Sequence, residues 1–242
     1  MPALDRLGLP IPLGGTSNHF RAAALTWLMA WDPFNITEDA DLGMRLARNG
    51  YRCRMLASTT YEEAPARLMS WLRQRTRWLK GYVQTWLVHM RSPRALWREL
   101  GPRGFFAFQI MLGGTVLSAL VHPWFYVLAA VELSGGGLLT QPATLFGWPF
   151  WLVAWFDLLA GYLASMWLGW LAVRRRAYAA LLAQIPLMPL YWLLISLAAY
   201  RALWQFTIAR FEWEKTEHGE AARRPAEAKA RSSRLRRLDC AP

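Results

Sequence analysis

Three long runs of apolar residues dominate the second half of the chain. They extend over Phe105–Leu133, Phe146–Val173 and Tyr178–Phe206, and each is nearly free of charged residues. A helix needs ~20 residues to cross about 30 Å of hydrocarbon, so each run is long enough to span a bilayer. Buried helices of soluble proteins are apolar as well, but three such lengths in succession favour membrane insertion.

The charges between these runs constrain the number of crossings. Three crossings would place the cluster at 174–176 and the Arg-rich C-terminal tail on opposite sides of the membrane. That arrangement would violate the bias that keeps Lys and Arg on the cytoplasmic side. Pro123 interrupts the first run, and Pro186 and Pro189 interrupt the third, which favours a hairpin, a re-entrant piece or an interface helix. We therefore expect an even number of crossings, such as four.

The first part of the chain has the mixed pattern of a soluble domain. Apolar residues share one face over Asp39–Asn49, which predicts a short amphipathic helix. Tyr51–Leu56 alternates in the manner of a strand. Between Arg67 and Met90 apolar residues recur at helical spacing among Arg and Lys. This third pattern predicts a helix that lies either on a membrane surface or against a soluble core.

Composition points towards lipid. Of the 242 residues 55% are hydrophobic and 15 are Trp, a side chain that collects at membrane interfaces. The formal charge is +12, and it comes mainly from clusters that flank apolar runs. We therefore expect the lipid bilayer, and no nucleic acid, as the partner of this charge. The two cysteines and four histidines lie in unlike contexts, so they predict neither a disulfide nor a zinc site.

Three carboxylates accompany the start of the first amphipathic helix: Glu38, Asp39 and Asp41. Negative side chains are favoured at a helix N-terminus, so capping by itself explains the cluster. The functional alternative is a general base, because a sugar hydroxyl is a poor nucleophile until a positioned group accepts its proton. Asp39 and Asp41 also fit a loose acidic pattern for Mg²⁺, although two acids one residue apart are common by chance.

Gln74, Arg77 and Trp78 lie within one turn of the second predicted helix and can reach a common site. A guanidinium offers a planar fork for phosphate, and an amide offers hydrogen bonds to hydroxyl or phosphate oxygens. An indole face can stack on a pyranose ring. Together these three side chains favour a sugar-phosphate ligand.

Thr37-Glu38-Asp39 and Gln74-Arg75-Thr76-Arg77-Trp78 resemble the paired TED and QxxRW motifs of processive family 2 glycosyltransferases. That group includes the synthases of cellulose, chitin and hyaluronan. Residues 13–20, 31–34 and 61–65 resemble the same family's sequence around those motifs. The resemblance covers nearly all of the chain except its tail, and it implies the C-terminal portion of such a membrane-bound enzyme.

The resemblance implies an inverting transfer from a nucleotide-sugar donor to a glycan or lipid-linked acceptor. Asp39 would be the catalytic base and Glu38 would support it. Trp78 would stack on the acceptor's terminal sugar, while Gln74 and Arg77 would contact the donor diphosphate near the leaving group. The substrate-binding residues on this interpretation are Thr37, Gln74, Arg77 and Trp78.

The corresponding fold class is α/β, with part of a GT-A-type domain followed by an α-helical transmembrane region. We expect catalytic domain with an interface helix over 1–92, a linker over 93–104, membrane helices over 105–210 and a cytoplasmic segment over 211–242. The last segment begins with Phe211–Gly219, which resembles the family's gating segment, and ends in a basic tail of disordered composition. The gating residues would be Trp213, Lys215 and Thr216.

The family's donor-binding half lies ahead of the TED motif and carries an acidic DxD motif that holds a metal on the diphosphate. We expect Mg²⁺ or Mn²⁺ in the complete enzyme, with ligands outside this chain, and no transfer by the chain alone. A truncated gene model, a split enzyme and a decayed remnant are the explanations, of which we favour the first. The expected location is the inner or plasma membrane, as a multi-pass protein whose catalytic part is cytoplasmic.

Two other functions fit the same residues. One is a non-catalytic membrane scaffold or channel subunit, in which the acidic cluster caps a helix and Trp78 anchors at the interface. The other is transfer to a single lipid-linked acceptor without polymerisation. The sugar, the linkage, the acceptor and the oligomeric state are not encoded in any pattern of this sequence.

Overall fold

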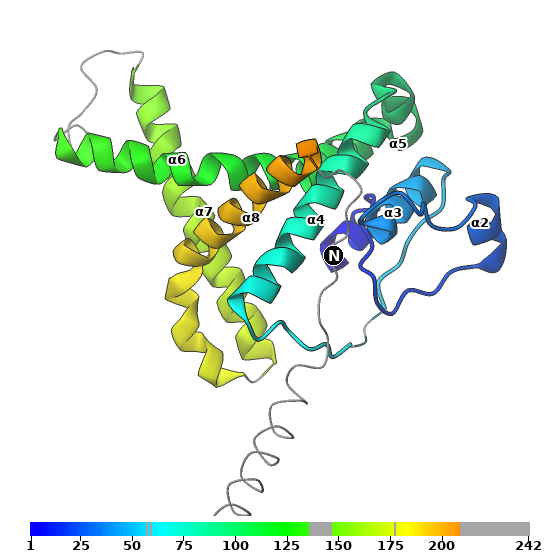
Figure 1. Ribbon diagram of the computed structural model, residues 1–242, viewed down its shortest axis with the longest axis horizontal. Helices are drawn as coiled ribbons and strands as arrows, with labels where there is room; N and C mark the ends of the chain where they lie inside the picture. Colours follow the sequence, from blue (N-terminus) through cyan, green and yellow to red (C-terminus); the bar gives the residue numbers. More distant parts are fainter. Residues whose placement is uncertain (57, 59, 136–146, 177, 209–242) are drawn as a thin grey trace, which may run out of the picture. The chain divides into compact units, whose positions relative to one another are not determined.

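The computed structural model describes residues 1–56, 58, 60–135, 147–176 and 178–208 (Figure 1). Every element in this described part is helical, so the predicted α/β class is wrong for it. The elements are α1 (Pro2–Arg6), α2 (Ala22–Trp27), α3 (Glu38–Arg48), α4 (Leu68–His89), α5 (Pro93–Phe108), η1 (Gln109–Gly114), α6 (Thr115–Ser134), α7 (Gly147–Arg175), η3 (Ala179–Leu187) and α8 (Met188–Ile208).

The predicted strand over residues 51–56 does not form. Its backbone groups bond elsewhere: Tyr51 N–H donates to the Leu46 carbonyl oxygen (3.0 Å), and Met55 N–H donates to Asp5 Oδ2 (2.8 Å). A strand needs a neighbouring strand to pair its N–H and C=O groups, and the described residues offer none. Alternation of side chains alone was therefore a misleading signal.

The chain divides into two compact units, which we describe separately. Of the described residues, unit 1 contains 1–116 and 198–208, and unit 2 contains those between 117 and 197. Both recognised motifs lie in unit 1. The stretch expected as a linker, 93–104, lies within α5 and buries Leu96 completely.

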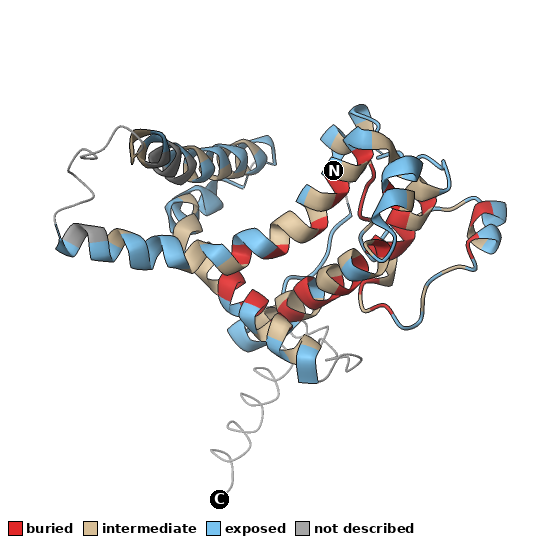
Figure 2. Cartoon of the chain, turned by 90° about the horizontal axis from the view of Figure 1, so that it is seen from above, coloured by how far each residue is buried: buried red, intermediate tan, exposed pale blue. Residues whose placement is uncertain are grey.

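Helix α3 joins the two apolar clusters of unit 1. Leu42 and Leu46 pack with Ala24 and Leu28 of the α2 region, whereas Met44 packs with residues of α5 and η1. Six of the eleven α3 residues are buried, in accord with its predicted amphipathic pattern (Figure 2). Gly43 is required here, because an added Cβ would overlap the Ile11 carbonyl oxygen. The position of α3 is therefore fixed on several sides.

Helix α4 buries a largely polar face. The apolar residues that predict this helix include Leu68 and Trp78, and both are exposed. The π-helical turn η1 beside α4 places Gly113 against the Trp86 indole, whose Nε1 donates to Gln109 Oε1 (2.7 Å). The buried residues of α4 are Thr76, Leu79, Lys80, Gly81, Gln84, Thr85 and His89.

Two helical runs are long and apolar enough to cross a membrane. They are Pro93–Val131, with 39 residues, and Ala179–Ile208, with 30 residues. They overlap the first and third predicted segments. The middle segment forms α7, a further helix of 29 residues that is not one of these two candidates. Length and composition thus give weak support to membrane association.

Candidate active site

The segment that precedes α3 is attached to α4 by side-chain hydrogen bonds. Gln84 donates from Nε2 to the Phe34 carbonyl oxygen (2.7 Å). Asn35 donates from Nδ2 to Thr85 Oγ1 (3.0 Å), and its Oδ1 accepts from the Thr37 N–H (3.1 Å). Asn35, Thr37 and Thr85 are buried, so these bonds satisfy groups that water does not reach. These bonds to α4 therefore fix the position at which the Thr37-Glu38-Asp39 motif begins.

A glycine sets the distance between α4 and the start of α3. Thr37 occupies the N-cap position of α3, but its side chain makes no capping hydrogen bond. It packs instead against Gly81 of α4, where an added Cβ would overlap Thr37 Oγ1 and Cγ2 and would lie 2.8 Å from Thr37 Cβ. Only glycine permits this close approach. The contact brings the first motif next to the helix that carries the second.

Asp41 lies at the inner end of this helix contact and is fully paired. Its Oδ2 accepts from Arg45 Nε (2.7 Å), and its Oδ1 lies 2.9 Å from His89 Nε2. His89 Nδ1 lies 3.0 Å from an Arg48 guanidinium nitrogen, which can only donate. With Arg48 as the donor at Nδ1, His89 donates from Nε2 to Asp41. Arg48 Nε also pairs with Glu99 of α5 (2.6 Å), so the network ties three helices together.

The pKa of Asp41 reflects this pairing. Burial raises the pKa, but the His89 hydrogen bond and the charge of Arg45 outweigh burial and hold the pKa below its usual range. Arg45 also donates to the carbonyl oxygens of Leu28 and Ala30 (2.7 Å each). Asp41 is thus a structural carboxylate.

Asp39 lies at the outer end of the same contact, and its carboxylate is only half-buried. Its Oδ1 accepts from the Ala40 N–H (2.7 Å), which is a local bond of the kind that the capping interpretation expects. Burial raises the pKa of Asp39, and the Ala40 hydrogen bond and the charge of Arg77 only partly offset this effect. A half-buried carboxylate with a raised pKa is suited to accept a proton.

Electrostatics connects the two motifs. Burial lowers the pKa of Arg77, while the negative charges of Glu38 and Asp39 oppose that change. Burial raises the pKa of Tyr82, and the charge of Asp39 raises it further. Two carboxylates of α3 and two side chains of α4 therefore share one electrostatic environment. Glu38 and Asp39 thus lie close enough to Arg77 for their charges to act on it.

The Trp78 indole is 39% exposed and lies against a neighbouring arginine. Arg75 Cζ lies 4.3 Å from the Trp78 ring centroid and 5.6 Å from that of Trp71, a cation–π arrangement. One face of Trp78 is therefore covered, and a ligand ring could stack only on its other face. Gln74 is half-buried.

Several residues of this region were missed by sequence reasoning. His89 was read as an isolated histidine, and Asp41 only as a possible cap or metal ligand. Arg75 and Lys80 were given no role, although Lys80 is only 1% exposed. A signal was present, because Thr76, Lys80 and Gln84 recur every four residues and form a polar stripe on one face of α4.

The loose Mg²⁺ pattern of Asp39 and Asp41 is not part of a ligand cluster in the described residues. No three His, Cys, Asp or Glu side chains gather there, and Asp41 of the loose Mg²⁺ pattern is occupied by Arg45 and His89. The predicted gating residues lie outside the described part of the chain: Trp213, Lys215 and Thr216.

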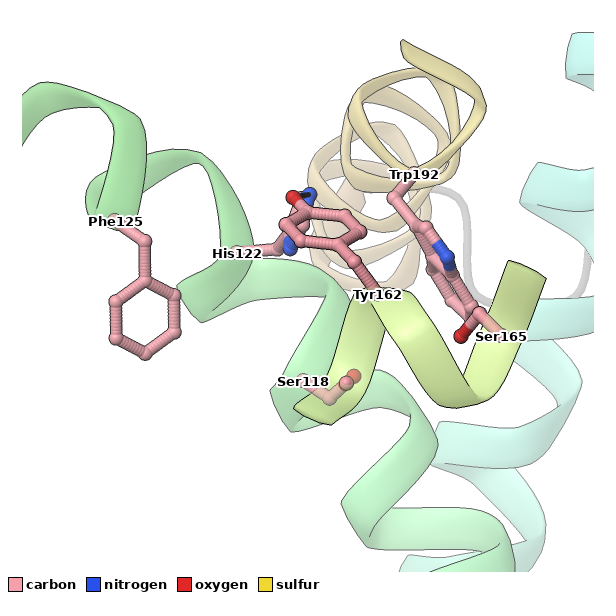
Figure 3. A pocket seen from close by; sticks show the side chains of 7 residues that line it. Ser118, His122, Phe125, Tyr162, Ser165 and Trp192 are labelled. Carbon is pink, nitrogen blue, oxygen red and sulfur yellow. Dashed lines mark hydrogen bonds between the residues drawn. The ribbon is translucent and has the colours of Figure 1, made fainter. Parts of the chain in front are cut away.

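Unit 2 contains a separate cavity (Figure 3). Tyr162 OH lies 2.5 Å from Tyr126 OH and 3.1 Å from His122 Nε2, so a short chain of polar groups borders it. No chemistry was assigned to these residues from the sequence. The lining side chains shown come from α6 (Ser118, His122, Phe125), α7 (Tyr162, Ser165) and α8 (Trp192).

Comparison with known proteins identifies one family. Residues 3–210 match the family described as glycosyl transferase family group 2. The chain is also similar to a "Probable glycosyltransferase YdaM" of Bacillus subtilis (strain 168), with 37% identity over 68 residues. That match covers 28% of this chain and 16% of the relative. No solved structure matches the chain.

Proposed function

Because the chain belongs to glycosyl transferase family group 2, we propose that it carries the acceptor side of an inverting transfer from a nucleotide sugar to a growing polysaccharide or another membrane-associated acceptor. The observation that supports this most is the shared environment of Asp39 and Arg77. Of the two aspartates in α3, Asp41 is held in ion pairs and Asp39 is not. Asp39 lies beside α4, whose Arg77 is a side chain of the type that binds phosphate.

The proposed step is an in-line displacement at the anomeric carbon of the donor. An acceptor hydroxyl oxygen attacks that carbon, and its proton passes to the Asp39 carboxylate. The bond between the anomeric carbon and the diphosphate oxygen breaks, and the nucleoside diphosphate leaves with the electron pair. Inversion follows because attack and departure occur on opposite sides of the carbon. Glu38 adds negative charge beside Asp39 and supports its role as a proton acceptor.

The substrates would lie along the outer face of α4. Arg77 would neutralise charge on the leaving diphosphate, and Gln74 would bond to its oxygens. Trp78 would receive the acceptor's terminal sugar on the face that Arg75 leaves uncovered. Thr37 would act through its contact with Gly81, by which it holds Asp39 at this distance from α4.

The proposed location is the inner or plasma membrane, with the part that carries the two motifs on the cytoplasmic side, where nucleotide sugars are made. The two helical runs that could cross a bilayer support this location. The matched relative is covered over 16% of its length, so the activity of the whole enzyme, including its use of Mg²⁺ or Mn²⁺, belongs to the proposal.

Transfer should depend on the Asp39 carboxylate. We would introduce Asp39→Asn into the producing cell's own gene and assay its membranes with a panel of labelled nucleotide sugars. Any partner chain is then present. Because Asn cannot accept the hydroxyl proton, incorporation should fall by about 100-fold to 10 000-fold. The size distribution of the labelled product separates a polymer from transfer to a single lipid-linked acceptor.

Asp32→Asn is the matched control. Asp32 accepts a hydrogen bond from the Phe34 N–H (2.9 Å), which Asn can also accept, and it lies outside the proposed site. This control should retain incorporation. Equal protein levels in the three membranes are a condition of the comparison. Full incorporation by Asp39→Asn would refute the general base and would favour a scaffold role.

A further inference from the structure

Helix α5 is kinked at Gly101, and aromatic rings before and after the kink contact one another. Gly101 has a φ of 66° and a ψ of 173°, a conformation that glycine adopts without the steric cost of a Cβ, and Pro102 follows it. The Trp97 ring centroid lies 5.1 Å from that of Phe105 and 5.8 Å from that of Phe106, each with edge-to-face geometry. Residues before and after the bend thus form one aromatic group.

Two rings of this group, Trp97 and Phe106, face outward, whereas Phe105 packs against the unit 1 core. Leu96 and Phe108, on the inner side of α5, are completely buried in the unit 1 core. In contrast, Trp97 is 43% exposed and Phe106 is 58% exposed. Neighbouring exposed rings are unfavourable in water, and they usually mark a surface that another body covers.

Arginines surround the exposed rings. Arg94 and Arg98 lie three residues before and one residue after Trp97, on the same side of the helix. Neither forms an ion pair with any described residue. The one acid nearby, Glu99, pairs with Arg48 (2.6 Å). The exposed face of α5 is therefore both aromatic and strongly positive.

We propose that this α5 surface, which comprises Arg94, Trp97, Arg98 and Phe106, binds the head groups of anionic lipids. Aromatic rings settle at the boundary of head groups and acyl chains, and guanidinium groups bind lipid phosphates. The location supports this partner, because α5 opens the helical run Pro93–Val131 that is long enough to cross a bilayer. Nucleic acid could also bind the positive charge, but it would not explain exposed aromatic rings at the start of an apolar helical run.

The inference rests on the proposed membrane location, and the experiment tests the two separately. Carbonate extraction of membranes first establishes whether the full chain is inserted. The chain is then reconstituted in phosphatidylcholine vesicles, with Cys53→Ala and Cys240→Ala in the background and a fluorophore on Ser92→Cys at the N-cap of α5. Small equal amounts of spin-labelled phosphatidylglycerol or spin-labelled phosphatidylcholine serve as quenchers.

The anionic quencher should be about threefold more effective than the zwitterionic one at low salt, because guanidinium groups enrich anionic lipid beside the label. Arg94→Glu with Arg98→Glu should abolish the preference. Arg6→Glu with Arg21→Glu, which changes two exposed arginines by the same charge, should retain it. Trp97→Ala with Phe106→Ala should weaken quenching by both lipids.

Three results would overturn the inference in a chain that resists extraction. Equal quenching by the two lipids would show a surface without head-group preference. Failure of both quenchers would show that α5 faces water or a protein partner. Retention of the preference in Arg94→Glu with Arg98→Glu would assign it to other charges.

Discussion

The inner and outer ends of the contact between α3 and α4 carry the same chemical groups in opposite states. At the inner end Asp41 has two partners on its two oxygens and lies almost out of reach of water. At the outer end Asp39 has one local hydrogen bond, a raised pKa and a half-buried carboxylate. The start of α3 thus carries one paired carboxylate, Asp41, and one available carboxylate, Asp39. The bonds of Asp41 fix the helix that positions Asp39.

The comparison predicts its largest effect at the inner end. Asp41→Ala leaves His89 and Arg45 without their buried acceptor, so it should lower the free energy of unfolding by about 3–5 kcal/mol. Asp39→Ala removes only one local bond and should change that free energy by less than about 1 kcal/mol. Urea unfolding of both variants in the same detergent measures the difference. Equal losses would mean that the two ends are not distinct.

The next effect concerns the spacing between the helices. Gly81→Ala introduces a methyl group into space held by Thr37, which should cost about 1–3 kcal/mol. Thr37→Gly in the same chain should recover part of this loss, because it removes all three Thr37 atoms that the added Cβ would overlap. Gly14→Ala is the control, since an added Cβ there meets no atom within 4 Å. Thermal unfolding should rank Gly14→Ala, the double variant and Gly81→Ala in order of falling stability; an additive loss in the double variant would contradict the packing described.

Particular residues show how far the sequence predicts this structure. Helix α3 and helix α4 follow from apolar spacing, and the two motifs follow from residue types at fixed positions. The predicted strand over 51–56 fails because pairing depends on a neighbour that alternation cannot reveal. The role of Asp41 also cannot be predicted from a local pattern, because its partner His89 lies 48 residues away and meets Asp41 only when α3 packs on α4.

The polar stripe of α4 was not expected from the apolar spacing that predicts this helix. Amphipathic helices normally bury their apolar side. Here Gln84 and Thr85 are buried because they form hydrogen bonds to the segment before α3. The buried face of α4 therefore also positions the proposed site. The indole of Trp78 remains exposed as a consequence.

The smallest predicted effect is a pH dependence of opposite sign at the two aspartates. The folded pKa of Asp39 is raised, so the folded state favours its protonated form, and its contribution to stability declines as pH rises through the unfolded and then the folded pKa. The folded pKa of Asp41 is depressed, so its contribution is present above the unfolded pKa and is lost as pH falls through the folded pKa. Asp39→Asn should therefore gain stability relative to the unaltered chain as pH rises above the ordinary Asp pKa of about 3.9. Asp32→Asn serves as the control in unfolding measured across this range. A gain of the same size in the control, or a loss in Asp39→Asn, would show that burial does not disfavour the Asp39 charge, and the argument for its activation as a base would lose its physical cause.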